Sequence, residues 1–254
     1  MIEVLLTNDD GIDAPGLQAL WDAVAAALRD SGFGESRMIV VAPDQGRSEC
    51  GHSVTTGQSL VLEPVKEDWF ALNGTPVDCV RAALGTVASR SAVVFSGVNA
   101  GANLGVDLMV SGTFAAAREA SLHGCPAIAL SHYRRPDVPK TWDHVPAWTR
   151  SVLTEFLTVS VGVKPRPSKN NRPQHAELWN VNLPAIEPSA PAPELRWCSA
   201  DPSPFERTAE LDQGRVAFNV DFHGRPRLAE HDVDLCFRGL MTVSRMSPHF
   251  QHVS

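Results

Sequence analysis

The chain has 254 residues, of which 43% are apolar and 20% charged, and its formal net charge is −7. This is the composition of an ordinary globular protein, and its acidic balance argues against binding to nucleic-acid polymers or anionic membranes, which requires a basic face. The first residues do not resemble a signal peptide, and no apolar run reaches the roughly 18 residues of a membrane span. The five cysteines are scattered and form no C-x-x-C motif. We therefore expect a cytoplasmic protein with reduced thiols.

Short apolar runs and helical apolar stripes alternate along the first part of the chain. The runs are typical of buried strands and the stripes of amphipathic helices. A strand–helix–strand opening implies a parallel sheet with right-handed crossovers. In chain order we expect a strand at residues 2–7, a helix at 17–28, a strand at 38–42, an antiparallel ribbon within 54–72, a helix at 77–87 capped by Thr75, and a strand at 92–96.

The alternation continues and then gives way to a proline-rich region. We expect a helix at 114–122, a strand at 126–131, a helix near 142–157, a loop at 164–174 and a strand at 177–183. The loop carries Lys164, Arg166 and Lys169, which we expect to be solvated, the alternative being contact with a substrate phosphate. Farther on we expect a strand at 215–222, a helical turn or two at 232–239 and a strand at 241–246. The sequence therefore predicts an α/β core over residues 1–186, followed by a smaller, irregular, β-containing extension over 187–254.

Polar side chains gather where the predicted strands end. Ligands of open parallel sheets bind outside the carboxyl ends of the strands, so we expect the functional site there. The first strand is followed by Asn8, Asp9 and Asp10, the second by Asp44, Arg47 and Ser48, and the third ends at Ser96 and is followed by Asn99 and Asn103, while the fifth carries Asn180 and Asn182.

The adjacent carboxylates of Asp9 and Asp10 repel each other, and a bound cation is the usual resolution. Carboxylate, amide and hydroxyl oxygens are hard ligands, which suit Mg²⁺, Mn²⁺ or Ca²⁺ rather than zinc. The alternative is that Asn-Asp-Asp-Gly is only a turn, in which the aspartates cap backbone amides.

Two further segments point to a phosphate ligand. The Gly-rich segment 97–105 is neither a dinucleotide fingerprint nor a P-loop; its glycines either let Asn99 and Asn103 point inward or simply make a flexible turn. Ser111-Gly112-Thr113 precedes a predicted helix, so its backbone amides and hydroxyls offer a seat for an anion. A plain Ser or Thr N-cap is the alternative.

Taken together, these motifs resemble the SurE family of metal-dependent 5′/3′-nucleotidases. The resemblance implies a Rossmann-like three-layer core with a mainly parallel sheet, and an extension used to form a homodimer or homotetramer. The matching segments follow the family's order: LLTNDDGIDAPG (5–16), VVAPDQGRS (40–48), NGTPVDCV (73–80), SGVNAGANLG (96–105), SGTFAAAREA (111–120) and, more weakly, NVNLP (180–184).

The resemblance also implies residue roles. One divalent ion per subunit, Mg²⁺ or Mn²⁺, is expected on Asp9, Asp10, Ser48 and Asn99, with an aspartate as base or nucleophile. The implied reaction is hydrolysis of nucleoside monophosphates, with short polyphosphate as a further substrate. Phosphate contacts are expected at Asn103, Ser111, Gly112 and Thr113.

The chain departs from the family at two places. Glu49 stands where the family usually has glycine, and residues 241–254 differ from the family's usual ending. A non-catalytic nucleotide- or metal-binding relative is the main alternative, although the complete set of ligand positions argues against it. A dinucleotide-dependent oxidoreductase lacks its glycine fingerprint here, and a serine hydrolase lacks its Gly-x-Ser-x-Gly elbow.

Overall fold

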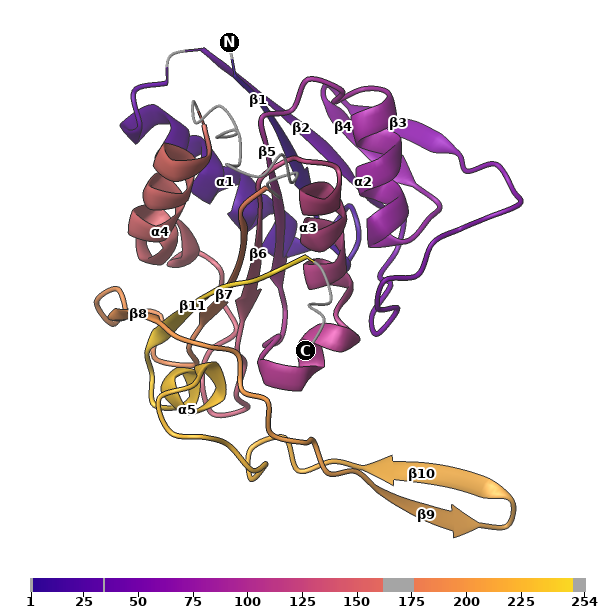
Figure 1. Ribbon diagram of the computed structural model, residues 1–254, viewed down its shortest axis with the longest axis vertical. Helices are drawn as coiled ribbons and strands as arrows, with labels where there is room; N and C mark the ends of the chain where they lie inside the picture. Colours follow the sequence, from indigo (N-terminus) through magenta and orange to yellow (C-terminus); the bar gives the residue numbers. More distant parts are fainter. Residues whose placement is uncertain (1, 34, 162–175, 249–254) are drawn as a thin grey trace, which may run out of the picture.

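The computed structural model describes residues 2–33, 35–161 and 176–248, through which a nine-stranded sheet runs with helices on both faces (Figure 1). The loop predicted at 164–174, with its basic side chains, and residues 249–254 lie outside the described residues. The strands of this sheet are β1 (Ile2–Thr7), β2 (Ser36–Pro43), β3 (Leu62–Lys66), β4 (Trp69–Leu72), β5 (Val93–Asn99), β6 (Ala127–His132), β7 (Leu178–Leu183), β8 (Leu195–Trp197) and β11 (Met241–Arg245). Their order across the sheet is β3-β4-β2-β1-β5-β6-β7-β11-β8.

The central part of the sheet is parallel. Parallel pairings join β4, β2, β1, β5, β6 and β7 in turn. Numbered along the chain, these six strands lie in the order 3-2-1-4-5-6, which is that of a doubly wound Rossmann-type sheet. The predicted α/β fold with a mainly parallel sheet is therefore confirmed. The order reverses between β1 and β5, and ligands bind in the crevice at such a reversal.

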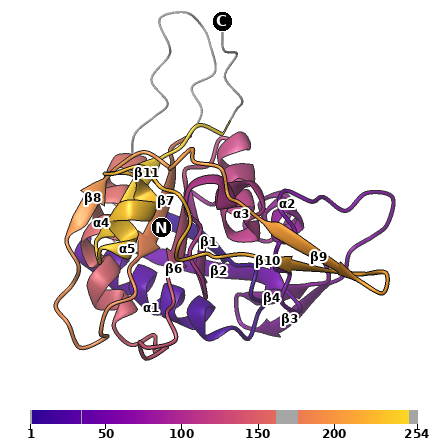
Figure 2. The same cartoon turned by 90° about the horizontal axis from the view of Figure 1, so that it is seen from below.

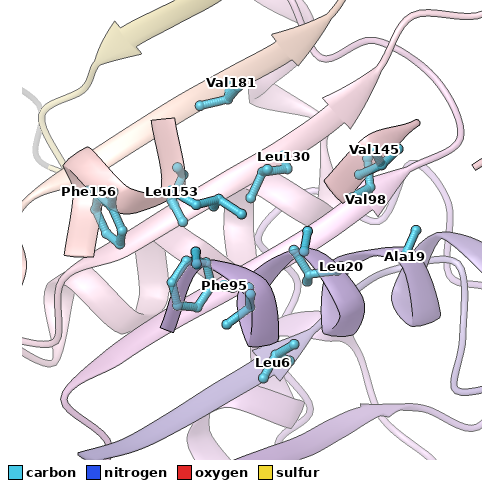
Figure 3. Packing of buried hydrophobic residues seen from close by; sticks show 14 of the residues in the cluster. Leu6, Ala19, Leu20, Phe95, Val98, Leu130, Val145, Leu153, Phe156 and Val181 are labelled. Atoms are coloured by element: carbon cyan, nitrogen blue, oxygen red, sulfur yellow. The ribbon is translucent and has the colours of Figure 1, made fainter. Parts of the chain in front are cut away.

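One face of the sheet is covered by α1 (Pro15–Asp30) and α4 (Val145–Ser160). Figure 3 shows Leu6 of β1 and Leu20 of α1 in the same cluster of side chains as Phe156 of α4. All three are fully buried, and burial of each such side chain stabilises the fold by about 1.5–3 kcal/mol. This layer fixes the position of β1, and therefore of the loop that follows it.

The opposite face is covered by α2 (Pro76–Gly85) and α3 (Gly112–Leu122). The helix α2 begins with a capping box, in which the side chains of Thr75 and Asp78 each accept the other's backbone N–H. The buried positions of α3 are mostly alanine, so its backbone can approach the sheet closely. The first turn of α3 consequently lies against the loop that follows β1.

Several predicted elements have different bounds in the structure. The antiparallel ribbon predicted within 54–72 is confined to β3 and β4, which turn at Asp68, whereas residues 54–61 form no strand. The third core strand continues past Ser96 to Asn99, which places Asn99 on the sheet rather than in the loop. The helix predicted at 142–157 begins at Val145 instead. These differences change element ends but not the order of elements.

The predicted extension is only partly separate from the core. Its strands β8 and β11 continue the main sheet beyond β7, and α5 (Asp232–Phe237) packs against β11, so residue 186 does not mark an edge of the sheet. The strands β9 (Thr208–Asp212) and β10 (Arg215–Asn219) form an exposed hairpin that projects from the body (Figures 1 and 2). The sequence did not predict β9, because its residues are mostly polar and none is buried.

Candidate metal and phosphate site

A cavity of about 550 Å³ opens at the carboxyl ends of β1 and β5, where the strand order reverses. All four predicted metal ligands line it, although they come from two loops and the end of β5. Two of the four predicted phosphate-binding residues line it as well. These six residues are Asp9, Asp10, Ser48, Asn99, Asn103 and Ser111.

Asp9 is buried and rests on the first turn of α3. The hydroxyl of Thr113 donates to Oδ1 of Asp9 at 2.6 Å, and the backbone N–H of Thr113 donates to Oδ2 at 3.1 Å. Burial nevertheless raises the pKa of Asp9 to about 6, against the effect of these hydrogen bonds. A Cβ on Gly112 would lie 3.0 Å from Oδ2 of Asp9, so this close approach requires glycine.

Asp10 faces the other side of the crevice. The N–H of Ala100, just after β5, donates to Oδ2 of Asp10 at 3.0 Å, and burial raises the pKa of this carboxyl group. Between the strand and this loop, Asn8 and Gly11 exchange hydrogen bonds and form a turn, with Gly11 at φ 104°. The two interpretations of Asn-Asp-Asp-Gly therefore coexist: the segment is a turn whose aspartates accept backbone amides, and both carboxylates also line the cavity.

The loop that carries Ser48 is tied to the rest of the site by its backbone. The N–H of Arg47 donates to the carbonyl of Asp9 at 2.7 Å, and the N–H of Gly51 donates to the carbonyl of Val110 at 3.0 Å. These two bonds bracket Ser48. Its position is therefore set by the β1 loop on one side and by the segment before α3 on the other.

A hydrogen bond to the buried carboxylate of Glu119 adds a third tie to this loop. His52 donates through Nε2 to Glu119 of α3 at 2.8 Å, because its Nδ1 accepts from Arg118 at 3.1 Å. Burial opposes ionisation of Glu119, but hydrogen bonds from His52 and Arg81 lower its pKa to about 2. The helix α3 thus holds two loops that carry predicted ligands, one through Thr113 and the other through Glu119.

The two asparagines of the Gly-rich loop are held differently. The side-chain nitrogen of Asn99 donates to the carbonyl of Gly101 at 2.9 Å, which leaves its Oδ1 as the candidate ligand atom. Asn103 is nearly buried, and its side-chain nitrogen donates to Ser131 at 2.7 Å. Asn180 and Asn182 of β7, which the sequence placed near the site, donate to the carbonyl of Asn103 at 3.0 and 2.9 Å. They therefore act on the cavity through Asn103.

The polar groups of the Ser111–Thr113 segment make two kinds of contact. Ser111 is the N-cap of α3, since its Oγ accepts from the N–H of Phe114 at 3.0 Å, and it lines the cavity. Gly112 and Thr113 lie behind Asp9 instead, and the donors of Thr113 are directed to that carboxylate. The donors of Thr113 point toward Asp9 because Asp9 packs against the helix, and the sequence pattern alone does not reveal this contact.

The opposite wall of the cavity was not predicted. Most of it comes from the segment around the β9–β10 hairpin, whose spaced aromatic residues were the available signal. Beneath it, the guanidinium of Arg225 lies 4.9 Å from the ring centre of Phe205, pairs with Asp107 and donates to the carbonyl of Leu104. Asp107 belongs to a short 3₁₀ helix, Gly105–Met109. The wall residues are Asp107, Phe205, Arg207, Phe218, Val220 and Phe222.

Among the described residues, no three His, Cys, Asp or Glu side chains are grouped so that they could hold a metal ion. The candidate site instead combines two carboxylates with neutral oxygens. All five cysteines are free thiols, as expected. Among the described residues no helix is long and apolar enough to cross a bilayer.

Comparisons with known proteins identify one family. A family model described as "Survival protein SurE" matches residues 4–205. A putative 5′-nucleotidase of Nostoc sp. (strain PCC 7120) is 37% identical over 244 residues, covering 96% of this chain and 98% of that protein. A 5′-nucleotidase SurE of Geotalea uraniireducens is 35% identical over 237 residues, covering 93% and 84%. The crystal structure of the SurE protein from Aquifex aeolicus has the same fold, with a TM-score of 0.76 at 23% identity, over 98% of this chain and 94% of that one.

Proposed function

The chain belongs to the survival protein SurE family, and from this premise we propose that it is a metal-dependent phosphomonoesterase that hydrolyses nucleoside monophosphates to nucleoside and phosphate. Relatives that share most of its length are named 5′-nucleotidases, which supports this substrate class. The observation that carries the proposal is the convergence of Asp9, Asp10, Ser48 and Asn99 on one cavity at the N-terminus of α3.

The donor set fits a single hard divalent cation such as Mg²⁺ or Mn²⁺. Asp9 and Asp10 are adjacent carboxylates, and burial raises the pKa of both. A bound cation would neutralise their charge and so offset the free-energy cost of burying two ionised carboxylates. Ser48 and Asn99 add neutral oxygens, which suit these ions better than zinc. When bound, the ion would supply positive charge to a phosphoryl oxygen and lower the pKa of a water molecule.

The protein's own groups provide orientation. Hydrogen bonds from Thr113 and Ala100 fix the orientations of the Asp9 and Asp10 carboxylates. The carboxylates therefore need not reorganise when substrate enters. Ser111 and Asn103 face the cavity, and we assign them to the remaining phosphoryl oxygens. The positive end of the α3 dipole favours an anion at this place. Direct phosphate contacts of Gly112 and Thr113 remain predictions, and so does the choice of an aspartate as base or nucleophile.

The size and lining of the cavity support a nucleotide as the substrate. A volume of about 550 Å³ exceeds what a phosphate group needs, and the far wall carries the rings of Phe205, Phe218 and Phe222. Aromatic rings are suitable stacking partners for a base. Short polyphosphate, which has no base, would leave this wall unused. The homodimer or homotetramer and the cytoplasmic location remain predictions.

A phosphate-release assay tests the proposal. With AMP and Mg²⁺ or Mn²⁺ we expect turnover that EDTA abolishes, and Asp9→Asn or Asp10→Asn should remove most of it. Asp13→Asn, on an exposed residue of the same loop, is the matched control and should retain turnover. A non-catalytic relative would instead bind AMP in calorimetry without releasing phosphate under any metal. Near-full turnover by both active-site variants would refute the metal-ligand assignment.

A further inference from the structure

Glu49 combines an unusual backbone with a place in the cavity. It follows Ser48 directly and lines the same cavity as Asp9 and Asp10. Its φ of 55° lies in the left-handed region, which costs a residue with a Cβ about 1–2 kcal/mol relative to the right-handed region. Strained backbone of this kind persists only where the surroundings impose it, and it gathers at functional sites.

The surroundings of Glu49 do impose its backbone. The bonds from Arg47 to Asp9 and from Gly51 to Val110 fix the chain on both sides of it. Gly51 is also left-handed, with φ 54°, and a Cβ there would lie 3.3 Å from the carbonyl of Met109. The carboxylate of Glu49 is therefore carried on an anchored loop at the cavity rather than on a free surface turn.

The charges around the cavity leave the carboxylate of Glu49 unbalanced. Asp107 is paired with Arg225 beneath the aromatic wall. A divalent ion would balance Asp9 and Asp10. Across the described part of the chain, the side chain of Glu49 forms no ion pair or hydrogen bond, and Arg207 is the one cationic residue of the cavity lining. A substrate that carries more negative charge than one phosphate group would be repelled by this carboxylate.

We propose that Glu49 is a specificity-determining residue, whose negative charge confines the site to phosphate monoesters and disfavours nucleoside diphosphates and polyphosphates. The inference rests on the proposed function, because it assumes that the terminal phosphate occupies the site beside Asp9 and Asp10. Like charges about 6 Å apart near a protein surface, partly screened by salt, change binding by about tenfold. Discrimination by repulsion is a common device of selective sites.

The test compares Glu49→Gln with Glu230→Gln. Glu230 is a second exposed, left-handed glutamate, with φ 62°, so it matches Glu49 in chemistry and backbone, but it pairs with Arg238 and does not line the cavity. We expect Glu49→Gln to raise the ratio of kcat/KM for ADP to that for AMP by about tenfold, and to tighten calorimetric binding of α,β-methylene-ADP relative to AMP by a similar factor. The change should shrink at high salt. Glu230→Gln should behave as the unmodified protein does.

Each other outcome has a definite meaning. An unchanged ratio in Glu49→Gln overturns the inference. An equal loss for both substrates together with weaker Mn²⁺ binding in calorimetry also overturns it, because Glu49 would then be a metal ligand. A change in Glu49→Gly without one in Glu49→Gln would show that side-chain size matters rather than charge, and would overturn it too. If the unmodified protein releases no phosphate from AMP, the proposed function fails, while the ratio of the two binding constants still tests the role of Glu49.

Discussion

Replacing Asp9 with asparagine is expected to stabilise the metal-free protein while removing its activity. Burial raises the pKa of Asp9 from 3.8 to about 6, so the charged form destabilises the fold by about 3 kcal/mol above pH 6. Asparagine carries no charge, but it has one acceptor oxygen where aspartate has two, so one of the two donors of Thr113 loses its partner, at a cost of about 1 kcal/mol. We therefore expect a net gain of about 1–2 kcal/mol at pH 8.

The pH dependence gives the sign of this effect. Because the folded-state pKa of Asp9 is raised, its contribution to stability is fully present below pH 3.8 and is lost as the pH rises through about 6. The advantage of Asp9→Asn should thus be largest at pH 8 and shrink toward pH 4.5. Urea unfolding in EDTA at both pH values measures it, with Asp13→Asn as the exposed control. Equal or lower stability of Asp9→Asn at pH 8 would refute the burial argument, whereas added Mg²⁺ should stabilise only the unmodified protein and the control.

Three further variants probe other parts of the site. Glu119→Gln should lose about 2–3 kcal/mol at pH 7, and because the folded-state pKa of Glu119 is lowered to about 2, urea unfolding should show the difference fading as the pH falls from 4.5 toward 2. Gly112→Ala places a Cβ 2.9 Å from that of Asp9, so calorimetry should show at least tenfold weaker metal binding; Gly85→Ala, with nothing within 4 Å, should not change it. Phe218→Ala should raise KM for AMP about tenfold through lost stacking and leave KM for glycerol phosphate unchanged; equal effects on both would exclude a base-binding role.

The positions of the ligand loops could be predicted from the sequence because strands with both faces buried leave a clear pattern. The strand β1 is an apolar run that stops at Asn8, and the ends found for it and for β7 lie within a residue of those expected. Parallel order then brings the ends of β1 and β5 together, so Asp9 and Asn99 line one cavity although 90 residues separate them. Local pattern and topology were enough for this half of the site.

The other half depends on contacts that leave no local pattern. Thr113 stands at a helix N-terminus, which suits either an anion or a neighbouring carboxylate, and only the packing of α3 against the β1 loop directs it to Asp9. The wall around Phe205 comes from residues about 200 positions after β1. The hairpin strand β9 buries neither face, and its five-residue alternation of polar and apolar side chains is too short to distinguish a strand from a loop.

The position of β11 in the sheet has a consequence for synthesis of the chain. β11 lies between β7 and β8 and pairs with both, yet among the described strands it is synthesised last. Until it emerges, β7 has an open edge and β8 has no partner, and open strand edges are templates for aggregation. A nascent or truncated chain that ends before Met241 should therefore need protection by chaperones, even though every residue proposed to hold the metal has already been made.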